Sequence, residues 1–215
     1  MSSAGTADRL QKYYVIPCNG GELVYPIKAR MNPYKEHRPA YCGGLPHFFG
    51  GSPNARESYQ QALRRETGEE SWQKCQLTSV YGIPFFFGTY IAEDGRTVEC
   101  RFFYSTIYSF NPTFLTLSAW SSKPPISREM CCTSRIPLLA FGPYVTQYDV
   151  SRILLENARN DSNVPQWAKD QMPPALNEEY CKSLYFRAFA CLIEDYFSGK
   201  LHFDQKLYAA GRKVG

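Results

Sequence analysis

This sequence has few histidines, and it lacks closely spaced cysteine pairs, long apolar runs and blocks of one charge. Only three of the 215 residues are histidine, and none of the eight cysteines forms a CxxC pair. Structural zinc sites need such closely spaced ligands, so no zinc centre is expected. The longest apolar runs, such as residues 83–87, are far shorter than a membrane span, so no membrane partner is expected.

The charge is small and evenly spread. The formal net charge is +4, and no run of five or more Lys or Arg occurs. This balance favours a small anionic ligand and does not call for nucleic acid. The first residues lack the apolar segment of a signal peptide, so we expect a cytoplasmic protein with free thiols.

Aromatic residues, in contrast, are plentiful, with 16 Tyr, 14 Phe and 3 Trp. They could fill a core or line a pocket, and core packing is favoured for most of them. On the other face of a strand pair they could stack on a base or clasp an apolar group such as a prenyl chain. A chain of this length fits one domain with some elaboration.

The first half of the chain reads as strands around one helix. Residues 13–17 and 22–27 predict a hairpin about Asn19-Gly20-Gly21, and 76–92 with 97–110 predict a second one. Residues 28–47 predict a long loop, and 55–66 predict a helix capped near 52–54.

The second half reads as mostly helical. A loop at 111–128 and a strand within 129–141 precede a helical stripe at 145–159. A proline-containing linker at 161–174 then leads to a long helix at 176–197.

The stretch Gly50 to Trp72 carries the strongest functional signal, because glutamates stand in it at ordered spacings. Positions i, i+3 and i+4 share one helix face, so Glu66, Glu69 and Glu70 present three carboxylates together. Like charges grouped in this way repel unless a cation joins them, and carboxylate oxygens are ligands that Mg²⁺ prefers. The preceding glycine, Gly50, would let a backbone carbonyl join the shell.

This stretch resembles the Nudix box. Every fixed letter of that pattern except its final glycine is matched. Gly51 is followed after five residues by Glu57, after seven more by Arg65-Glu66, and after two more by Glu69-Glu70. Trp72 stands at the position of the final glycine. A surface helix rich in Glu and Arg would not require the glycine pair or these gaps.

The resemblance implies an α+β fold, an α/β/α sandwich in which a mixed β-sheet lies between helices. We expect a tail at 1–9, where residues are small and polar, a Nudix domain at 10–160, and a helical extension at 161–215 packed on the same domain.

The resemblance also implies a metal site and a catalytic group. Gly50, Glu66, Glu69 and Glu70 would bind Mg²⁺ (or Mn²⁺), and Gly51, Glu57 and Arg65 would support the loop, the last two as an ion pair. The catalytic residues would be Glu66, Glu69 and Glu129; Glu93 and Asp94 are rivals of Glu129 for the general base.

Three residues depart from the family pattern. Thr67 replaces an apolar residue, Gly68 follows it, and Trp72 replaces a glycine that normally adopts a positive φ. The departures indicate a divergent member, because none of them removes a metal ligand.

The expected substrate is a small organic diphosphate, by default a nucleoside derivative, with an isoprenoid diphosphate as a non-nucleotide option. We expect Arg30, Arg38 and Phe48 to contact it. A homodimer could form through Tyr185, Phe189 and Tyr196. The expected activity is Mg²⁺-dependent hydrolysis of a diphosphate linkage, and the alternative is a Nudix-fold binding or regulatory protein with little turnover.

Overall fold

The computed structural model describes residues 10–19, 21–35, 37–112 and 115–201, so the expected tail at 1–9 lies outside the described residues. The strands are β1 (Leu10–Pro17), β2 (Glu22–Lys28), β3 (Phe49–Gly51), β4 (Cys75–Leu77), β5 (Phe86–Ile91), β6 (Thr97–Ser105), β7 (Tyr108–Phe110) and β8 (Met130–Pro137). The helices are α1 (Tyr59–Glu70), α2 (Leu117–Ser121), α3 (Gln147–Asn160), α4 (Gln166–Lys169), α5 (Glu178–Cys181) and α6 (Leu184–Phe197), with 3₁₀ turns η1 (Pro125–Arg128) and η2 (Leu138–Ala140).

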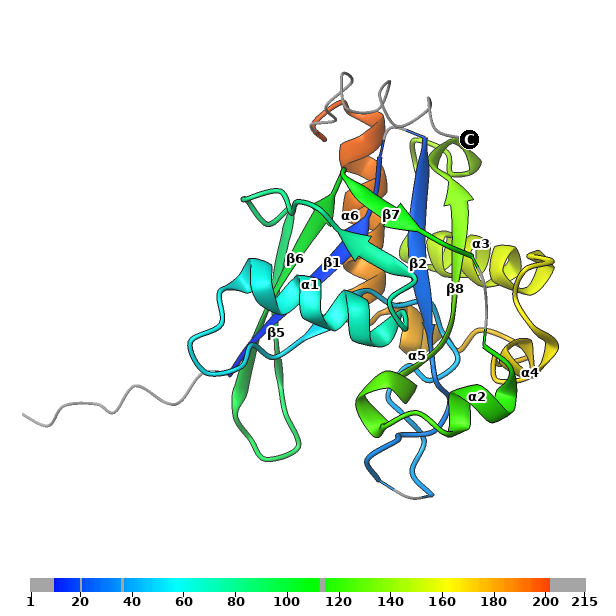
Figure 1. Cartoon of the computed structure of the whole chain (residues 1–215). Coiled ribbons are helices and arrows are strands. Elements are labelled where there is room, and N and C mark those ends of the chain that lie inside the picture. Colours follow the sequence, from blue (N-terminus) through cyan, green and yellow to red (C-terminus); the bar gives the residue numbers. More distant parts are fainter. Residues whose placement is uncertain (1–9, 20, 36, 113–114, 202–215) are drawn as a thin grey trace, which may run out of the picture.

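A mixed four-stranded sheet in the order β3-β1-β6-β5 lies at the centre of the fold (Figure 1). β1 runs parallel to β6 and antiparallel to β3, while β5 and β6 form an antiparallel pair. Two shorter ladders, β2–β8 and β4–β7, complete the strand pairing. The second predicted hairpin is thus present over β5 and β6. The outer ends of its two predicted segments pair separately, as β4 with β7.

The sheet has a helix on each face. Along β1, Tyr14 and Ile16 belong to one buried cluster with Phe189 of α6. Val15, which points to the opposite face of the strand, packs in a second cluster with Leu63 of α1. The sheet therefore lies between α1 and α6, which confirms the predicted α+β sandwich.

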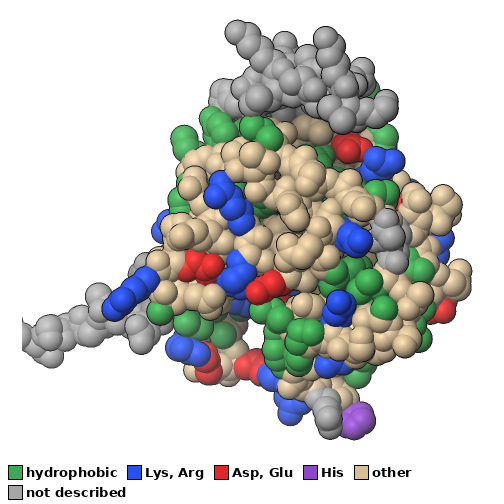
Figure 2. Space-filling view, in the orientation of Figure 1, with side chains coloured by type: hydrophobic (Ala, Val, Ile, Leu, Met, Phe, Trp, Pro, Cys, Tyr) green, Lys and Arg blue, Asp and Glu red, His purple; other side chains and the backbone are tan. Residues whose placement is uncertain are grey.

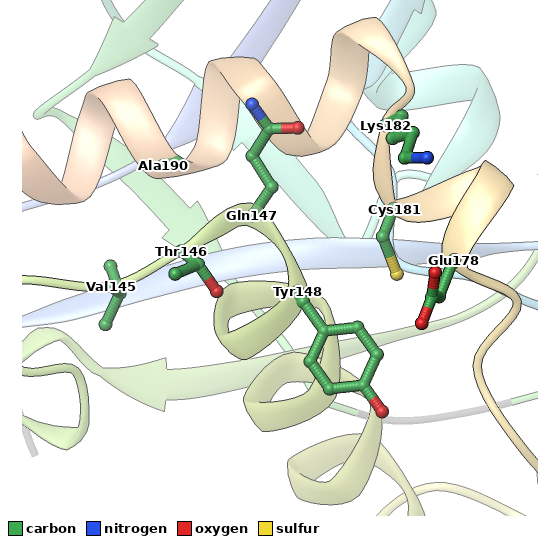
Figure 3. A pocket seen from close by; sticks show the side chains of 8 residues that line it. All are labelled: Val145, Thr146, Gln147, Tyr148, Glu178, Cys181, Lys182 and Ala190. Atoms are coloured by element: carbon green, nitrogen blue, oxygen red, sulfur yellow. The ribbon is translucent and has the colours of Figure 1, made fainter.

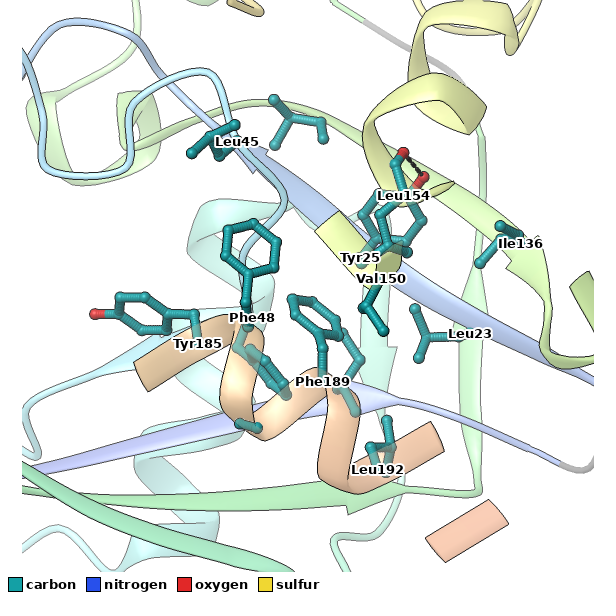
Figure 4. Close-up of a cluster of buried hydrophobic side chains, with 14 of the residues drawn as sticks. Leu23, Tyr25, Leu45, Phe48, Ile136, Val150, Leu154, Tyr185, Phe189 and Leu192 are labelled. Carbon is teal, nitrogen blue, oxygen red and sulfur yellow. Dashed lines mark hydrogen bonds between the residues drawn. The ribbon is translucent and has the colours of Figure 1, made fainter. Parts of the chain in front are cut away.

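Helix α6 contributes large side chains to the main core (Figure 4). The rings of Phe48 and Phe189 lie 4.2 Å apart between centroids, and the hydroxyl of Tyr25 donates to the carbonyl oxygen of Leu154 at 2.7 Å. Tyr185 and Phe189 are both buried in this chain. These two rings are packed within the chain and do not form the predicted dimer face, while a homodimer as such stays a prediction.

The first predicted hairpin is also wrong. Its turn exists, since Oδ1 of Asn19 accepts hydrogen bonds from the backbone nitrogens of Gly21 and Glu22. However, β3 and β6 occupy both edges of β1, and β2 pairs with β8 instead. Only a single bridge, Cys18 with Leu23, joins the two segments among the described residues.

The long helix predicted at 176–197 is divided in two. Ser183 has an extended backbone, with ψ of 156°, and separates α5 from α6. Serine competes with helix geometry through its own side chain and is favoured at helix starts. The loop at 111–128 and the linker at 161–174 likewise contain short helical turns, α2, η1 and α4.

All eight cysteines are free. Within the described ranges, no helix is both long and apolar enough to cross a membrane.

Candidate active site

Two adjacent glycines end β3 and allow α1 to approach the strand. Gly50 has a φ of +141°, and a Cβ there would lie 2.1 Å from the carbonyl oxygen of Tyr13. A Cβ at Gly51 would lie 2.7 Å from Oε1 of Glu66. Both positions therefore need glycine: the first for its backbone conformation, and the second so that a carboxylate can reach the strand.

The start of α1 is fixed by a capping box. Oγ of Ser58 accepts from the backbone nitrogen of Gln61, and Oε1 of Gln61 accepts from the backbone nitrogen of Ser58. The helix thus begins later than the sequence predicts, and residues 54–57 form a turn before it. The cap sets the direction in which the box glutamates project.

Arg65 connects the loop to the helix. Its guanidinium makes two 3.0 Å hydrogen bonds to Glu57, and its Nη1 lies 3.0 Å from both Glu66 and Glu69. A further bond of 3.3 Å reaches the carbonyl oxygen of Ser52. The predicted ion pair is therefore present, and hydrogen bonding to Arg65 lowers the pKa of Glu57.

Glu66 and Glu70 point inward from α1, and their exposed fractions are 8% and 1%. The backbone nitrogen of Gly50 donates to Oε2 of Glu70 at 2.8 Å. Burial, followed by the charges of Glu129 and Glu66, raises the pKa of Glu70 well above 4.5. Burial also raises the pKa of Glu66, although Arg65 acts in the opposite direction. Two carboxylates are thus held where ionisation is unfavourable without a cation.

Glu129 joins them from a distant part of the sequence. It precedes β8 at an irregular step of the β2–β8 ladder, where Lys28 is opposite Met130. The backbone carbonyl oxygen of Glu129 accepts a hydrogen bond from the backbone nitrogen of Ala29 at 2.7 Å. Burial, and then the charge of the Glu129 carboxylate, raise the pKa of Tyr34, which lines the same cavity. The rival acids lie elsewhere and are engaged, Glu93 with Lys35 and Asp94 with Arg96.

Glu66, Glu70 and Glu129 line one cavity of about 330 Å³ and provide its negative charge. Its positive charge comes from Lys12, Lys28 and Arg65. Burial lowers the pKa of Lys28, while Glu129 and Glu70 act to raise it. A cavity with both charges can hold an anion and a cation together.

Glu69 does not reach this cavity. Its carboxylate is held by Arg65, and it is not among the cavity-lining residues. The sequence expectation that three box glutamates share one site thus holds only for Glu66 and Glu70. Among the described residues, no three His, Cys, Asp or Glu side chains stand close enough to hold a metal ion between them.

The residues nevertheless fit a hard divalent cation. Mg²⁺ usually binds through one or two carboxylates, with waters and substrate phosphates filling the other positions, and does not need an all-protein cage. Glu66 and Glu70 are carboxylates of this kind, with Glu129 across the same cavity. Burial, then the charges of Glu129 and Glu66, disfavour the ionised form of Glu70, and a bound cation would favour it.

The three residues predicted to contact substrate lie outside this cavity. Arg30 lines a neighbouring cavity of about 780 Å³ with Trp120 and Arg128. Arg38 is exposed on the loop, and Phe48 is fully buried in the main core. Phe48 is therefore a packing residue. Its position after a histidine in an apolar strand fits a core residue and a pocket residue equally well, so the sequence could not separate the two.

Several residues that sequence reasoning did not assign to the site also line the cavity, among them Lys12, His47 and Tyr185. Lys12 lies on β1 and Tyr185 on α6, far from the box in sequence. His47 stands only three residues before Gly50, and a lone histidine in an apolar segment was the one local signal.

The exit of α1 explains two departures from the family pattern. Trp72 adopts a φ of +54°, so the conformation expected of the missing glycine is kept. Its indole nitrogen donates to the carbonyl oxygen of Ser127 at 2.6 Å, which ties the helix end to the turn before Glu129. A Cβ at Gly68 would lie 2.9 Å from the side chain of Gln73, so this glycine makes room for that side chain.

The third departure, Thr67, is fully buried, and its hydroxyl has no hydrogen-bond partner within the described part of the chain. Nothing in the structure explains this choice.

A separate cavity of about 540 Å³ lies where α3, α5 and α6 meet (Figure 3). Thr146, Tyr148, Cys181 and Lys182 are among its lining residues, and no box glutamate is. On the face shown in Figure 2, acidic and basic side chains are interspersed without a broad area of one sign. The cavity that contains Glu66 and Glu70 is thus the candidate active site.

No protein-family model matches the chain, and no curated protein matches it. Among solved structures, a NUDIX hydrolase from Nitrosomonas europaea is similar at 11% identity over 93% of this chain and 95% of that one, with a TM-score of 0.48. A MutT NUDIX hydrolase from Burkholderia pseudomallei is 14% identical over 70% of this chain and 98% of its own, with a TM-score of 0.44. The Bacillus subtilis pyrophosphohydrolase BsRppH is 12% identical over 63% and 67%, with a TM-score of 0.38.

The resemblance to the Nudix family rests on the box residues and their geometry.

Proposed function

We propose that this chain is a Nudix pyrophosphohydrolase that uses Mg²⁺ (or Mn²⁺) to cleave a diphosphate linkage in a small organic diphosphate. The observation that carries the proposal is the single cavity in which Glu66, Glu70 and Glu129 lie with Lys12 and Lys28. Carboxylates would hold the cation, and ammonium groups would hold phosphate oxygens. No other described cavity combines these groups with the box.

The chain's residues divide the work. Glu66 and Glu70 would bind the cation, and the glycine corner at Gly50 would bring backbone oxygen close to it. A bound divalent cation supplies phosphate charge neutralisation and a coordinated water of lowered pKa. Glu129, which lines the same cavity, would serve as the general base.

Arg65 and Glu57 have a supporting role. Their paired hydrogen bonds fix the loop before α1, and the same guanidinium restrains Glu66. Glu69 completes this brace from outside the cavity.

The experiment is a phosphate-release screen with Mg²⁺ over nucleoside, sugar and prenyl diphosphates, comparing wild type with Glu66→Gln and Glu70→Gln. The matched control is Glu156→Gln, which removes a carboxylate from the exposed side of α3 where it pairs with Arg152. We expect loss of release in both box variants and wild-type rates in the control. Wild-type inactivity across the panel, with ligand binding retained, would instead support the binding or regulatory alternative.

A further inference from the structure

His47 presents a buried hydrogen-bond acceptor that the protein itself does not use. Its Nδ1 lies 2.8 Å from the carbonyl oxygen of Phe48, and a carbonyl can only accept, so Nδ1 carries the hydrogen. In the neutral ring, Nε2 then has a free lone pair. This atom has no hydrogen-bond partner among the described residues, and the side chain is only 2% exposed.

The ring is held in place on the wall of the active-site cavity. Its centroid lies 3.9 Å from that of Tyr185 and 5.9 Å from that of Tyr14, and the two tyrosine hydroxyls are 3.0 Å apart. Figure 4 shows the ring of Tyr185 directed away from the cluster around Phe189. Since Nδ1 is bound to the backbone, Nε2 is the polar atom that His47 can offer to the cavity.

His47 stays neutral in this position. Burial, then the charges of Lys28 and Lys12, lower the pKa of the imidazole well below 6.5. An unpartnered buried acceptor is unfavourable until a donor reaches it. Phosphate oxygens without protons cannot be that donor, because they carry lone pairs of their own.

We propose that Nε2 of His47 accepts a hydrogen bond from a hydroxyl group in the organic part of the substrate. This inference rests on the proposed function, since it concerns the same cavity. The lysines and the cation site would take the diphosphate, and His47 would select what is attached to it. The site would thus favour hydroxyl-bearing diphosphates, such as nucleotide or sugar derivatives, over prenyl diphosphates. A site built to bond a hydroxyl discriminates against analogues that lack it.

The test compares wild type, His47→Phe and His47→Gln on ADP-ribose, ADP, 2′,3′-dideoxy-ADP and geranyl diphosphate. Phenylalanine keeps a ring but removes the acceptor, while the amide of glutamine reaches the position of Nε2. We measure kcat/KM with Mg²⁺, and affinity by calorimetry in the Glu66→Gln background, which should bind without turnover.

We expect His47→Phe to weaken ADP-ribose and ADP about 10-fold, as for one buried hydrogen bond, and to leave the other two probes within about twofold. His47→Gln should recover most of the loss, and wild type should prefer ADP to 2′,3′-dideoxy-ADP. An equal loss of kcat on all probes would overturn the proposal and indicate that His47 bonds a water. No change on any probe would also overturn it.

Two controls separate failures. If His47→Phe does not fold, the ratio of wild-type kcat/KM for ADP to that for 2′,3′-dideoxy-ADP tests the proposal. A ratio near one would overturn it. If wild type turns over no probe, the proposed function fails, while the calorimetric preference still tests His47.

Discussion

The two walls of the active-site cavity differ in how the chain builds them. The acidic wall, Glu66 and Glu70, comes from one helix, where the two residues stand four apart and Arg65 pairs with Glu66. The basic wall draws Lys12, Lys28, His47 and Tyr185 from separate elements. One contiguous motif thus supplies the carboxylates of the proposed cation site. The residues proposed to contact substrate come together only when the chain folds.

The largest expected effect separates two neighbouring glutamates of α1. Glu70→Gln should lower kcat by about 10²–10³-fold, in the range for loss of one transition-state contact, because Glu70 lies inside the cavity. Glu69→Gln should cost less than about 10-fold, since Glu69 pairs with Arg65 outside it. Steady-state kinetics with Mg²⁺ measure both. Equal losses would show that Glu69 turns into the cavity during turnover.

The second effect concerns the basic wall. Lys28→Met should raise KM about 10–100-fold through loss of a charged hydrogen bond to phosphate, with a smaller change in kcat. Lys35→Met is the matched control, because Lys35 is 49% exposed and pairs with Glu93 on the surface. A fall in kcat alone, with KM unchanged, would argue against a ground-state phosphate contact.

The third effect tests the link between the end of α1 and Glu129 through Trp72. Trp72→Phe removes the hydrogen bond to Ser127, and should lower kcat by about 10-fold because Glu129 loses precise placement. Trp72→Gly removes the same bond while relieving the positive φ. It should therefore match Trp72→Phe in kcat but exceed it in melting temperature. Wild-type kcat in both variants would show that the indole is only packed there.

The smallest expected effect is on the free energy of unfolding, and it tests the burial of Glu70 directly. The pKa of Glu70 is raised above 4.5 in the folded state, chiefly by burial, so its contribution to stability is complete below 4.5 and is lost as pH rises through the raised value. Metal-free protein should thus lose stability above pH 4.5, and Glu70→Gln should recover about 1–2 kcal/mol near pH 8.

Thermal melts over pH 4–8, with and without Mg²⁺, check this sign. Mg²⁺ should raise the melting temperature of wild type more at high pH than at low pH, and should do so less in Glu70→Gln. A pH-independent Mg²⁺ effect would argue against Glu70 as a ligand.

Sequence reasoning was most accurate where structure is local. The box, its ion pair between Glu57 and Arg65, and the pairing of β5 with β6 all follow from residues close together in the chain. It failed where distant segments compete. The hairpin of β1 with β2 did not form because β3 and β6 take both edges of β1, and Phe48 became a core residue because α6 packs over it.

The sequence by itself determined the carboxylates of the candidate site, because helix periodicity and glycine conformations act over a few residues, and the α+β class was implied by the resemblance of that stretch to the Nudix box. The pairing of Glu69 with Arg65 is local too, since the two residues stand one helical turn apart. Tertiary structure alone decided that Glu129, rather than Glu93 or Asp94, meets Glu70. It also decided that His47 keeps an unused acceptor beside Tyr185. Burial and long-range charge set these outcomes, and both depend on which distant segments fold against the box.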